Sequence, residues 1–301
     1  MTEQIALEIK QNEIDKIIDV CLDATMLDTF LDCPAKFNYR FNMNKHTLTK
    51  PPALDRGDLI HKGLEPYYLA LKDKLPFEDA LEKAKNGFDI ATIDSDLEPD
   101  EIRQQKNSLI ESIHFWKNTD FRYEVLAVES PFAYVLYADN TIRITMIGKI
   151  DLLINDGAYR NTPVDHKSYS RDFPLSKLAN QFCNYAYACK SNYLFVNRVG
   201  LQTSLPPEKK HKRQPLSYDS IFLEQWKQNV VEWCYDYVNC VADNKWRLNT
   251  TSCGKYNRIC EYNDICTSSG IDAKIYKLNA QFKDGEKWDV AKSLGLTVKR
   301  D

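Results

Sequence analysis

The stretch from Thr141 to Ser170, TIRITMIGKIDLLINDGAYRNTPVDHKSYS, decides the fold expected of this chain. β-Branched and aromatic residues dominate both of its halves, and the Asn-Asp-Gly sequence at 155–157 is typical of a turn. A similar stretch, rich in Val and Tyr, precedes it at 123–137. We therefore expect three sequential antiparallel strands, at 123–137, 141–154 and 158–170.

Charged residues stand inside this strand pattern. Asp151 interrupts an apolar run, and Asp165 and Lys167 lie two residues apart. Side chains alternate along a strand, so Asp165 and Lys167 share one face while His166 points the other way. Buried carboxylates favour a bound cation, and a lysine beside them can act on an attacking water. These residues alone are equally compatible with polar strand ends and a solvated lysine.

The register of the two strands affects whether the acids can meet. If Asp156 and Gly157 form a two-residue loop, Asp165 faces Gly148, and its offset from Asp151 is roughly 10 Å along the strands. A bulge or splay is then required. Pro163 is the expected place for it, because proline cannot donate to the strand ladder.

Helical patterns surround these strands. Before them, apolar spacing predicts helices at 25–33, at 59–68 and over 77–118, the last with a break at 94–100. After them come a helix at 175–190, a strand at 193–203, a basic loop between prolines at 205–215 and a long helix at 218–244. This order predicts an α+β or α/β fold, in which helices cover both sides of a mixed sheet.

Composition narrows the class of protein. The 301 residues are 43% hydrophobic with a net charge of −3, which indicates a folded chain that binds nucleic acid only through a local basic surface. No apolar run approaches roughly 18 residues, and residues 1–20 lack a secretory signal. We expect a cytoplasmic protein without membrane association. The nine cysteines then favour metal binding or core packing over disulfides.

Eight of the nine cysteines, all except Cys21, fall into two groups. One group lies in a polar tail, where Cys253, Cys260 and Cys266 are separated by six and five residues, a spacing that favours a shared metal with Cys33 as the fourth ligand. The other group has helical spacing and is expected to be buried as small hydrophobes: Cys183, Cys189, Cys234 and Cys240. Core packing stays an alternative for the tail group as well.

Several motifs together resemble the PD-(D/E)XK nuclease superfamily, in its RecB-like branch. GKID at 148–151 and DHK at 165–167 resemble its G-x-[IV]-D and D-x-K pair. GDLIH at 57–61 resembles its helical G-x-x-x-H motif, and QFCNY at 181–185 its Q-x-x-x-Y motif. The resemblance covers about residues 25–267.

The resemblance implies a restriction-endonuclease-like core in a single nuclease domain, 1–301. Its parts would be an N-terminal helical region at 25–118, a sheet core at 119–204, a helix with the cysteine cluster at 205–267 and a tail at 268–301. The implied activity is that of a metal-dependent deoxyribonuclease, an exonuclease on single strands or DNA ends in repair or recombination. Its implied partners are DNA and a helicase or recombination protein.

The resemblance also assigns residues to roles. The metal ligands for Mg²⁺ or Mn²⁺ would be His61, Asp151, Asp165 and the backbone carbonyl of His166. The catalytic residues would be Lys167 with Asp151 and Asp165, and the DNA contacts would be Gln181 and Tyr185. Glu129 lies near the place where the family often has an acid, and we expect it to be structural. The basic run EKKHKR at 208–213 is a further candidate for phosphate contact.

The cysteine pattern adds a second cofactor. One early cysteine, Cys33, and three late ones, Cys253, Cys260 and Cys266, resemble the [4Fe–4S] sites of AddB-type and CRISPR-adaptation nucleases. The chain departs from them at the first gap, where they more often have C-x₂-C, so Zn²⁺ stays an alternative. Two other functions stay open: a non-catalytic DNA-binding or assembly module, and an iron–sulfur or zinc protein of redox or RNA-modification function.

Overall fold

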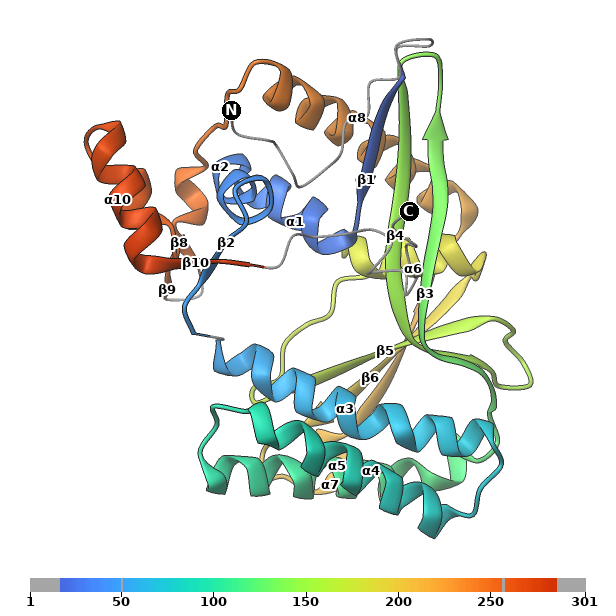
Figure 1. Ribbon diagram of the computed structural model, residues 1–301. Helices are drawn as coiled ribbons and strands as arrows, with labels where there is room; N and C mark the ends of the chain where they lie inside the picture. The colour runs from blue at the N-terminus through green and yellow to red at the C-terminus, as the bar shows by residue number, and fades with distance from the viewer. Residues whose placement is uncertain (1–16, 50, 256–257, 286–301) are drawn as a thin grey trace, which may run out of the picture. The chain divides into compact units, whose positions relative to one another are not determined.

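The computed structural model describes residues 17–49, 51–255 and 258–285. The chain divides into two compact units, coloured along the sequence in Figure 1. The cysteine unit comprises Met1–Thr49, Ala133–Gly148 and Ile221–Asp301, and the site unit comprises Lys50–Phe132 and Lys149–Ser220. Two strands contribute residues to both units: β3 (Glu124–Ala138) and β4 (Ile142–Asn155). The single-domain organisation expected from the resemblance stays a prediction.

The site unit contains both helices and strands. Its helices are α3 (Pro52–Lys72), α4 (Phe77–Ala91), η2 (Thr92–Asp94), α5 (Pro99–Asp120), α6 (Asn180–Cys189) and α7 (Pro207–Lys210). Its strands, besides the shared ones, are β5 (Thr162–Tyr169), β6 (Tyr193–Gly200) and β7 (Lys212–Ser217). β4 pairs antiparallel with β5, β5 parallel with β6, and β6 antiparallel with β7. This central mixed sheet flanked by helices confirms the expected fold class.

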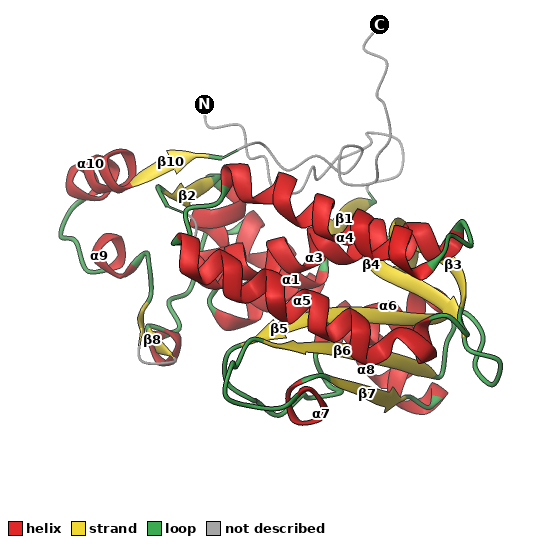
Figure 2. Cartoon of the chain, turned by 90° about the horizontal axis from the view of Figure 1, so that it is seen from below, coloured by secondary structure: helices red, strands yellow, loops and turns green. Residues whose placement is uncertain are grey.

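Three helices cover one face of the sheet in this unit. In Figure 2, α3, α4 and α5 run side by side, and their apolar side chains share a core with Leu152, Val164 and Val199. Gly63 lets α3 approach α5 closely, because a Cβ there would come within 2.2 Å of a Leu109 methyl. Val164 faces this core, so the side chains of Asp165 and Lys167 face the opposite side of the sheet, toward α6.

The register of β4 and β5 differs from the one expected. Leu152 pairs with Val164, Leu153 with Pro163 and Ile154 with Thr162, and the connecting loop spans residues 156–161. The loop closes on its own side chains: Asp156 Oδ1 accepts from the N–H of Tyr159 at 2.8 Å, and Asn155 Oδ1 from that of Asn161 at 2.9 Å. The two-residue loop was therefore wrong, and so was the bulge at Pro163, which lies in regular pairing.

The last strand of the site unit, β7, was not expected. It falls in the region 205–215 that the sequence indicated as a basic loop, and it contains Pro215. Proline is tolerated at the edge of a sheet, where its missing N–H breaks no ladder bond. β6 and β7 pair from Tyr193↔Ser217 to Arg198↔Lys212, so the basic run enters the sheet.

The cysteine unit is built from shorter elements. Its strands are β1 (Ile18–Leu22), β2 (Lys45–Thr47), β8 (Gly254–Lys255), β9 (Arg258–Ile259) and β10 (Phe282–Asp284). Its helices are α1 (Ala24–Asp32), α2 (Pro34–Phe37), η1 (Asn38–Asn42), η3 (Thr250–Ser252), α9 (Asn263–Cys266) and α10 (Ile271–Gln281), with all of α8 (Ser220–Ala242) except its first residue. β1 pairs parallel with the first part of β4, from Ile18↔Ile142 to Leu22↔Met146. Among the helices described over 17–285, none combines the length and apolar character needed to cross a membrane.

Candidate metal centre

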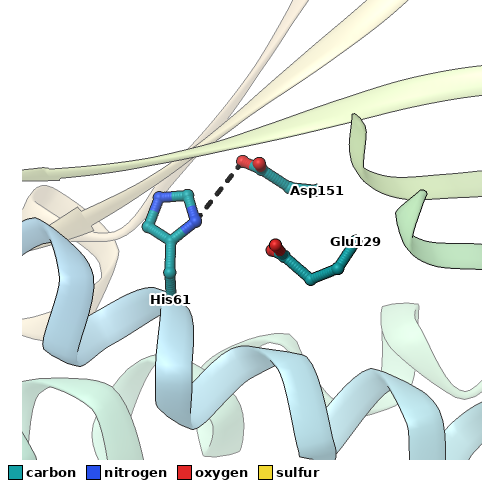
Figure 3. Close-up of side chains that lie close together, drawn as sticks. All are labelled: His61, Glu129 and Asp151. Carbon is teal, nitrogen blue, oxygen red and sulfur yellow. Dashed lines mark ion pairs between the residues drawn. The ribbon is translucent and has the colours of Figure 1, made fainter. Parts of the chain in front are cut away.

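Three side chains from three elements of the site unit converge. His61 comes from α3, Glu129 from β3 and Asp151 from β4, and one potential ligand atom of each lies within 4.8 Å of the others (Figure 3). His61 Nδ1 is 3.6 Å from Asp151 Oδ2. The three line a cleft of about 430 Å³, whose wall also includes Lys149 and Lys167. An imidazole with two carboxylates is a donor set suited to Mn²⁺ or Mg²⁺.

A backbone carbonyl sets the orientation of the His61 ring. Nε2 lies 2.9 Å from the carbonyl oxygen of His166, and a carbonyl only accepts, so Nε2 carries the ring proton. Nδ1 then presents its lone pair toward Asp151. Burial lowers the pKa of His61 and favours this neutral form, the form in which histidine binds metals. A ligating histidine usually has such a partner on its other nitrogen.

Asp151 is held from the opposite strand. Its Oδ2 accepts a hydrogen bond of 2.8 Å from the backbone N–H of His166. Burial, with a smaller contribution from the nearby Glu129 carboxylate, raises the pKa of Asp151 to about 6. Two carboxylates that disfavour each other's charge in a buried place are stabilised by a cation between them.

Asp165 lies beside this group with Lys167. Asp165 is fully buried, and Lys167 Nζ is 3.0 Å from each of its carboxylate oxygens. Burial, with a smaller contribution from the nearby Asp151 carboxylate, raises the pKa of Asp165 to about 6. Among the described residues, two of the expected ligands, His61 and Asp151, belong to the group within 4.8 Å. The third member of that group is Glu129, not the expected Asp165. The ligand role of Asp165 stays a prediction.

Glu129 is the residue whose position the sequence reasoning missed. It lies in a strand at a φ of 48°, in the left-handed region that non-glycine residues rarely adopt. Its carboxylate pairs with Lys149, which borders the same cleft. Strained backbone of this kind is concentrated at functional sites. The signal in the sequence was an acid inside the strand pattern of 123–137, followed two residues later by Pro131.

The two residues expected to contact DNA lie inside a hydrogen-bonded chain. Lys167 Nζ donates to Gln181 Oε1 at 2.9 Å, Gln181 Nε2 donates to the Tyr185 hydroxyl at 3.1 Å, and that hydroxyl donates to the carbonyl of Lys149 at 2.7 Å. Tyr185 is only 5% exposed. Their helical spacing does bring both to one face of α6, as expected. Their role at DNA stays a prediction.

The basic run at 208–213 is engaged within the protein. Lys210 is buried and pairs with Glu111 at 2.5 Å. Lys212 pairs with Asp172. Arg213 is nearly enclosed and pairs with Asp120 at 2.8 Å. The expected loop is therefore replaced by α7 and β7, and three cations of the run have partners within the protein. Contact of the run with phosphates stays a prediction.

In the cysteine unit, the four cysteines expected to share a metal line one small cavity: Cys33, Cys253, Cys260 and Cys266. Burial raises the pKa of the Cys266 thiol, and Cys33 and Cys253 are close enough to raise it further. The backbone N–H of Asn249 donates to Cys33 Sγ at 3.5 Å. Among the described residues no three of these thiols lie within 4.8 Å of one another, so the structure brings them to one cavity but not to the distance at which they would share one metal ion. Four thiolates are the donor set of either an iron–sulfur cluster or Zn²⁺. Of the other group, Cys183, Cys234 and Cys240 are buried as expected, while Cys189 is half-buried.

A mixed sheet that presents paired acids and a lysine to a cleft is suited to metal-assisted hydrolysis. The sequence model of the PD-(D/E)XK nuclease superfamily matches residues 22–267, and the chain belongs to this superfamily. Its class is therefore that of the nucleases, the hydrolases of nucleic acid. Among curated proteins, no sequence matches this chain significantly.

Solved structures similar to the chain include the following two. One, from Eubacterium rectale and described as a candidate exonuclease, has 14% sequence identity and a TM-score of 0.47, with 87% of this chain and 93% of that chain covered. The other, the crystal structure of SSO0001, has 12% identity and a TM-score of 0.36, with coverages of 76% and 78%.

Proposed function

We propose that this chain is a divalent-metal-dependent deoxyribonuclease. The observation on which the proposal rests is the convergence of His61, Glu129 and Asp151 within 4.8 Å, in a cleft that Lys167 also lines. Membership of the nuclease superfamily supports the choice of a phosphodiester as the substrate.

The proposed division of labour follows the contacts. His61, Glu129 and Asp151 hold Mg²⁺ or Mn²⁺, and Asp165 completes the ligand set. The carbonyl of His166, a ligand in the resemblance, instead accepts from Nε2 of His61 on the far side of the ring from the cation. The cation supplies charge neutralisation at the phosphate under attack.

Lys167 is the catalytic cation of the proposal. Asp165 and Gln181 hold its ammonium group at 3.0 and 2.9 Å, and a cation fixed in this way can orient the attacking water and stabilise developing charge. Because its own partners lie on the sheet and on α6, its position does not depend on the substrate.

The substrate and setting come from the RecB-like motifs at 57–61, 148–151, 165–167 and 181–185. We infer an exonuclease that acts on single-stranded DNA or DNA ends in the cytoplasm, in repair or recombination, with a helicase or recombination protein as its partner. Gln181 and Tyr185, which the resemblance places at DNA, would hold Lys167 beside the bound strand through their hydrogen bonds.

The purified protein tests this proposal with end-labelled single- and double-stranded DNA and Mn²⁺ or Mg²⁺. We expect cleavage that EDTA abolishes, and a loss on the order of a hundredfold or more in Asp165→Ala. Asp89→Asn, an exposed acid that pairs with Lys106, is the matched control and should keep full activity. Cleavage that persists in Asp165→Ala would overturn the catalytic assignment. A wild-type protein that binds DNA without cutting it would favour the non-catalytic module.

We further propose that the four cysteines hold a [4Fe–4S] cluster. They come from the N-terminal segment, at Cys33, and from the segment 253–266, so the cluster would join the two within the cysteine unit. The one cavity that all four thiols line supports the proposal.

Anaerobic purification tests the cluster. A brown protein that absorbs near about 400 nm and contains iron and sulfide is expected. Cys260→Ser should lose both, and Cys189→Ala, outside the group, should keep them. One equivalent of zinc without iron would replace the cluster by a zinc site. A brown protein inert toward all DNA and RNA would favour the redox or RNA-modification function.

A further inference from the structure

A buried network of polar side chains lies behind the metal centre, on the face of β5 opposite to Lys167. It surrounds the imidazole of His166, which is itself only 2% exposed. Its members come from α3, the end of α5, β6 and β7: Tyr68, Asp120, Asn197 and Arg213. The proposed function assigns none of these side chains a task.

Only one orientation of the Asn197 amide satisfies the hydrogen-bond donors and acceptors of this network. Arg213 Nη2 is 3.4 Å from Asn197 Oδ1, and a guanidinium has only donors, so the amide oxygen of Asn197 must face it. The amide nitrogen of Asn197 therefore faces His166 and donates to its Nδ1 at 3.1 Å. Arg213 is in turn fixed by its ion pair of 2.8 Å with Asp120.

A second contact clamps the same ring from α3. The Tyr68 ring stacks on the His166 ring with centroids 5.3 Å apart and planes 10° apart. The Tyr68 hydroxyl donates to Asp120 Oδ2 at 3.3 Å, which returns to the ion pair. The His166 side chain is thus held along its plane by Asn197 and across its plane by Tyr68.

The backbone of the clamped residue supports the metal centre. The N–H of His166 holds the Asp151 carboxylate at 2.8 Å, and its carbonyl accepts from His61 Nε2 at 2.9 Å. Two of the three converging side chains therefore take their orientation from one peptide residue. A shift of His166 would move both together.

The residue types in this polar network also favour a role in orienting the metal ligands. A buried ion pair recovers its desolvation cost poorly, and hydrophobic replacements are often as stable, so Asp120 and Arg213 are weakly explained by stability. Orientation of metal ligands needs directional contacts, which a network of hydrogen bonds provides and an apolar core does not.

We propose that Tyr68, Asn197 and the Asp120–Arg213 pair are positioning residues for the metal centre, and that they act through His166. This inference rests on the proposed metal-dependent function. The network fixes the backbone of His166, whose N–H and carbonyl orient Asp151 and His61 for the cation.

Two variants test the inference. Asn197→Leu is close in size and removes both hydrogen bonds of the amide, and His166→Phe keeps the stacking on Tyr68 but removes the acceptor. We expect each to weaken Mn²⁺ binding, measured by titration calorimetry, by about 10- to 100-fold. Cleavage should return at saturating Mn²⁺, with the KM for DNA unchanged. Leu81→Ala, in the apolar core of α4, is a destabilising control that should keep wild-type Mn²⁺ affinity.

A second readout needs no metal. The chain has five histidines, so ¹⁵N NMR can resolve each ring. In metal-free wild-type protein we expect both His61 and His166 as Nε2–H tautomers. In Asn197→Leu, the His61 signals should shift or broaden, and in Leu81→Ala they should not.

The outcomes separate the two proposals. Wild-type protein that binds no Mn²⁺ refutes the proposed function, and the inference about metal positioning falls with it. Wild-type protein that binds Mn²⁺, with Asn197→Leu and His166→Phe binding it within twofold of wild type, refutes the inference alone. Should Asn197→Leu fail to fold, His166→Phe and the NMR of its His61 ring decide the question.

Discussion

The backbone N–H of His166 donates a 2.8 Å hydrogen bond to the side chain of Asp151, which lies just beyond the paired residues Leu152 and Val164. At this point a ladder between backbone groups gives way to a contact between backbone and carboxylate. The contact places an acid of β4 against β5 without a bulge. It also fixes the distance between the two strands at the residue where the cleft begins.

Metal affinity should depend on pH near 6. Burial raises the pKa of both Asp151 and Asp165 to about 6 in the metal-free protein, so protons compete with the cation there. From pH 6 to pH 5, we expect Mn²⁺ affinity to fall by about 10- to 100-fold, for one or two protons displaced. Calorimetric titrations at pH 5, 6, 7 and 8 measure this fall. A constant affinity from pH 5 to 7 would mean that neither carboxylate binds the metal.

Removing the charge of Asp165 should stabilise the metal-free protein while abolishing cleavage. The pKa of Asp165 is raised from 3.8 to about 6, so its contribution to stability is complete below pH 3.8 and is lost as the pH rises through 6. Asp165→Asn avoids this loss and should gain on the order of 1–3 kcal/mol at pH 7. Urea unfolding in EDTA at pH 7 and pH 4 checks the sign, because the gain should be nearly absent at pH 4.

Glu129 should contribute to metal binding and carry backbone strain. We expect Glu129→Gln to weaken Mn²⁺ binding by about tenfold or more, because it removes a charged ligand. Glu129→Gly should lose the same affinity but unfold at equal or higher denaturant than Glu129→Gln, because glycine adopts a φ of 48° without strain. Wild-type affinity in both variants would return Glu129 to the structural role that its sequence suggested.

Gln181 and Tyr185 can be assigned to lysine positioning or to DNA contact by kinetics. Their hydrogen bonds run to Lys167 and to the Lys149 carbonyl. For Gln181→Ala and Tyr185→Phe we therefore expect a lower kcat, by about 10-fold or more, with little change in the KM for DNA. A raised KM with an unchanged kcat would instead show that both side chains contact the strand. Unfolding measured in parallel should show a cost of about 0.5–1.5 kcal/mol per lost hydrogen bond.

Local patterns predicted much of the fold because they depend on local physics. The apolar spacing of Leu59, Ile60 and Tyr68 follows the face that α3 buries, and strand alternation put His166 and Lys167 on opposite faces. The helix break at 94–100 falls between α4 and α5, where Pro99 begins the second helix. Each of these features is decided by residues close together in the sequence.

The remaining features depend on contacts distant in sequence. A turn signal at 155–157 does not reveal that Asn155 and Asp156 extend the loop to residue 161, so the register was three residues off. The resemblance placed Glu129 near a family acid, but it could not show that this carboxylate converges with His61 and Asp151, which depends on the left-handed backbone of Glu129 in β3. The basic run looked solvated because its partners Glu111, Asp120 and Asp172 come from other segments.

The division of the chain has a consequence for its synthesis. Every residue of the site unit has been made once translation reaches Ser220, whereas the cysteine unit needs residues from Met1 onward and again beyond Ile221. Domains generally fold as they emerge, so the cleft can form while the last three cysteines are still untranslated. Cys33 then waits as a single thiol until Cys266 is made. Insertion of the proposed cluster would then be the closing step of maturation, after the cleft has formed.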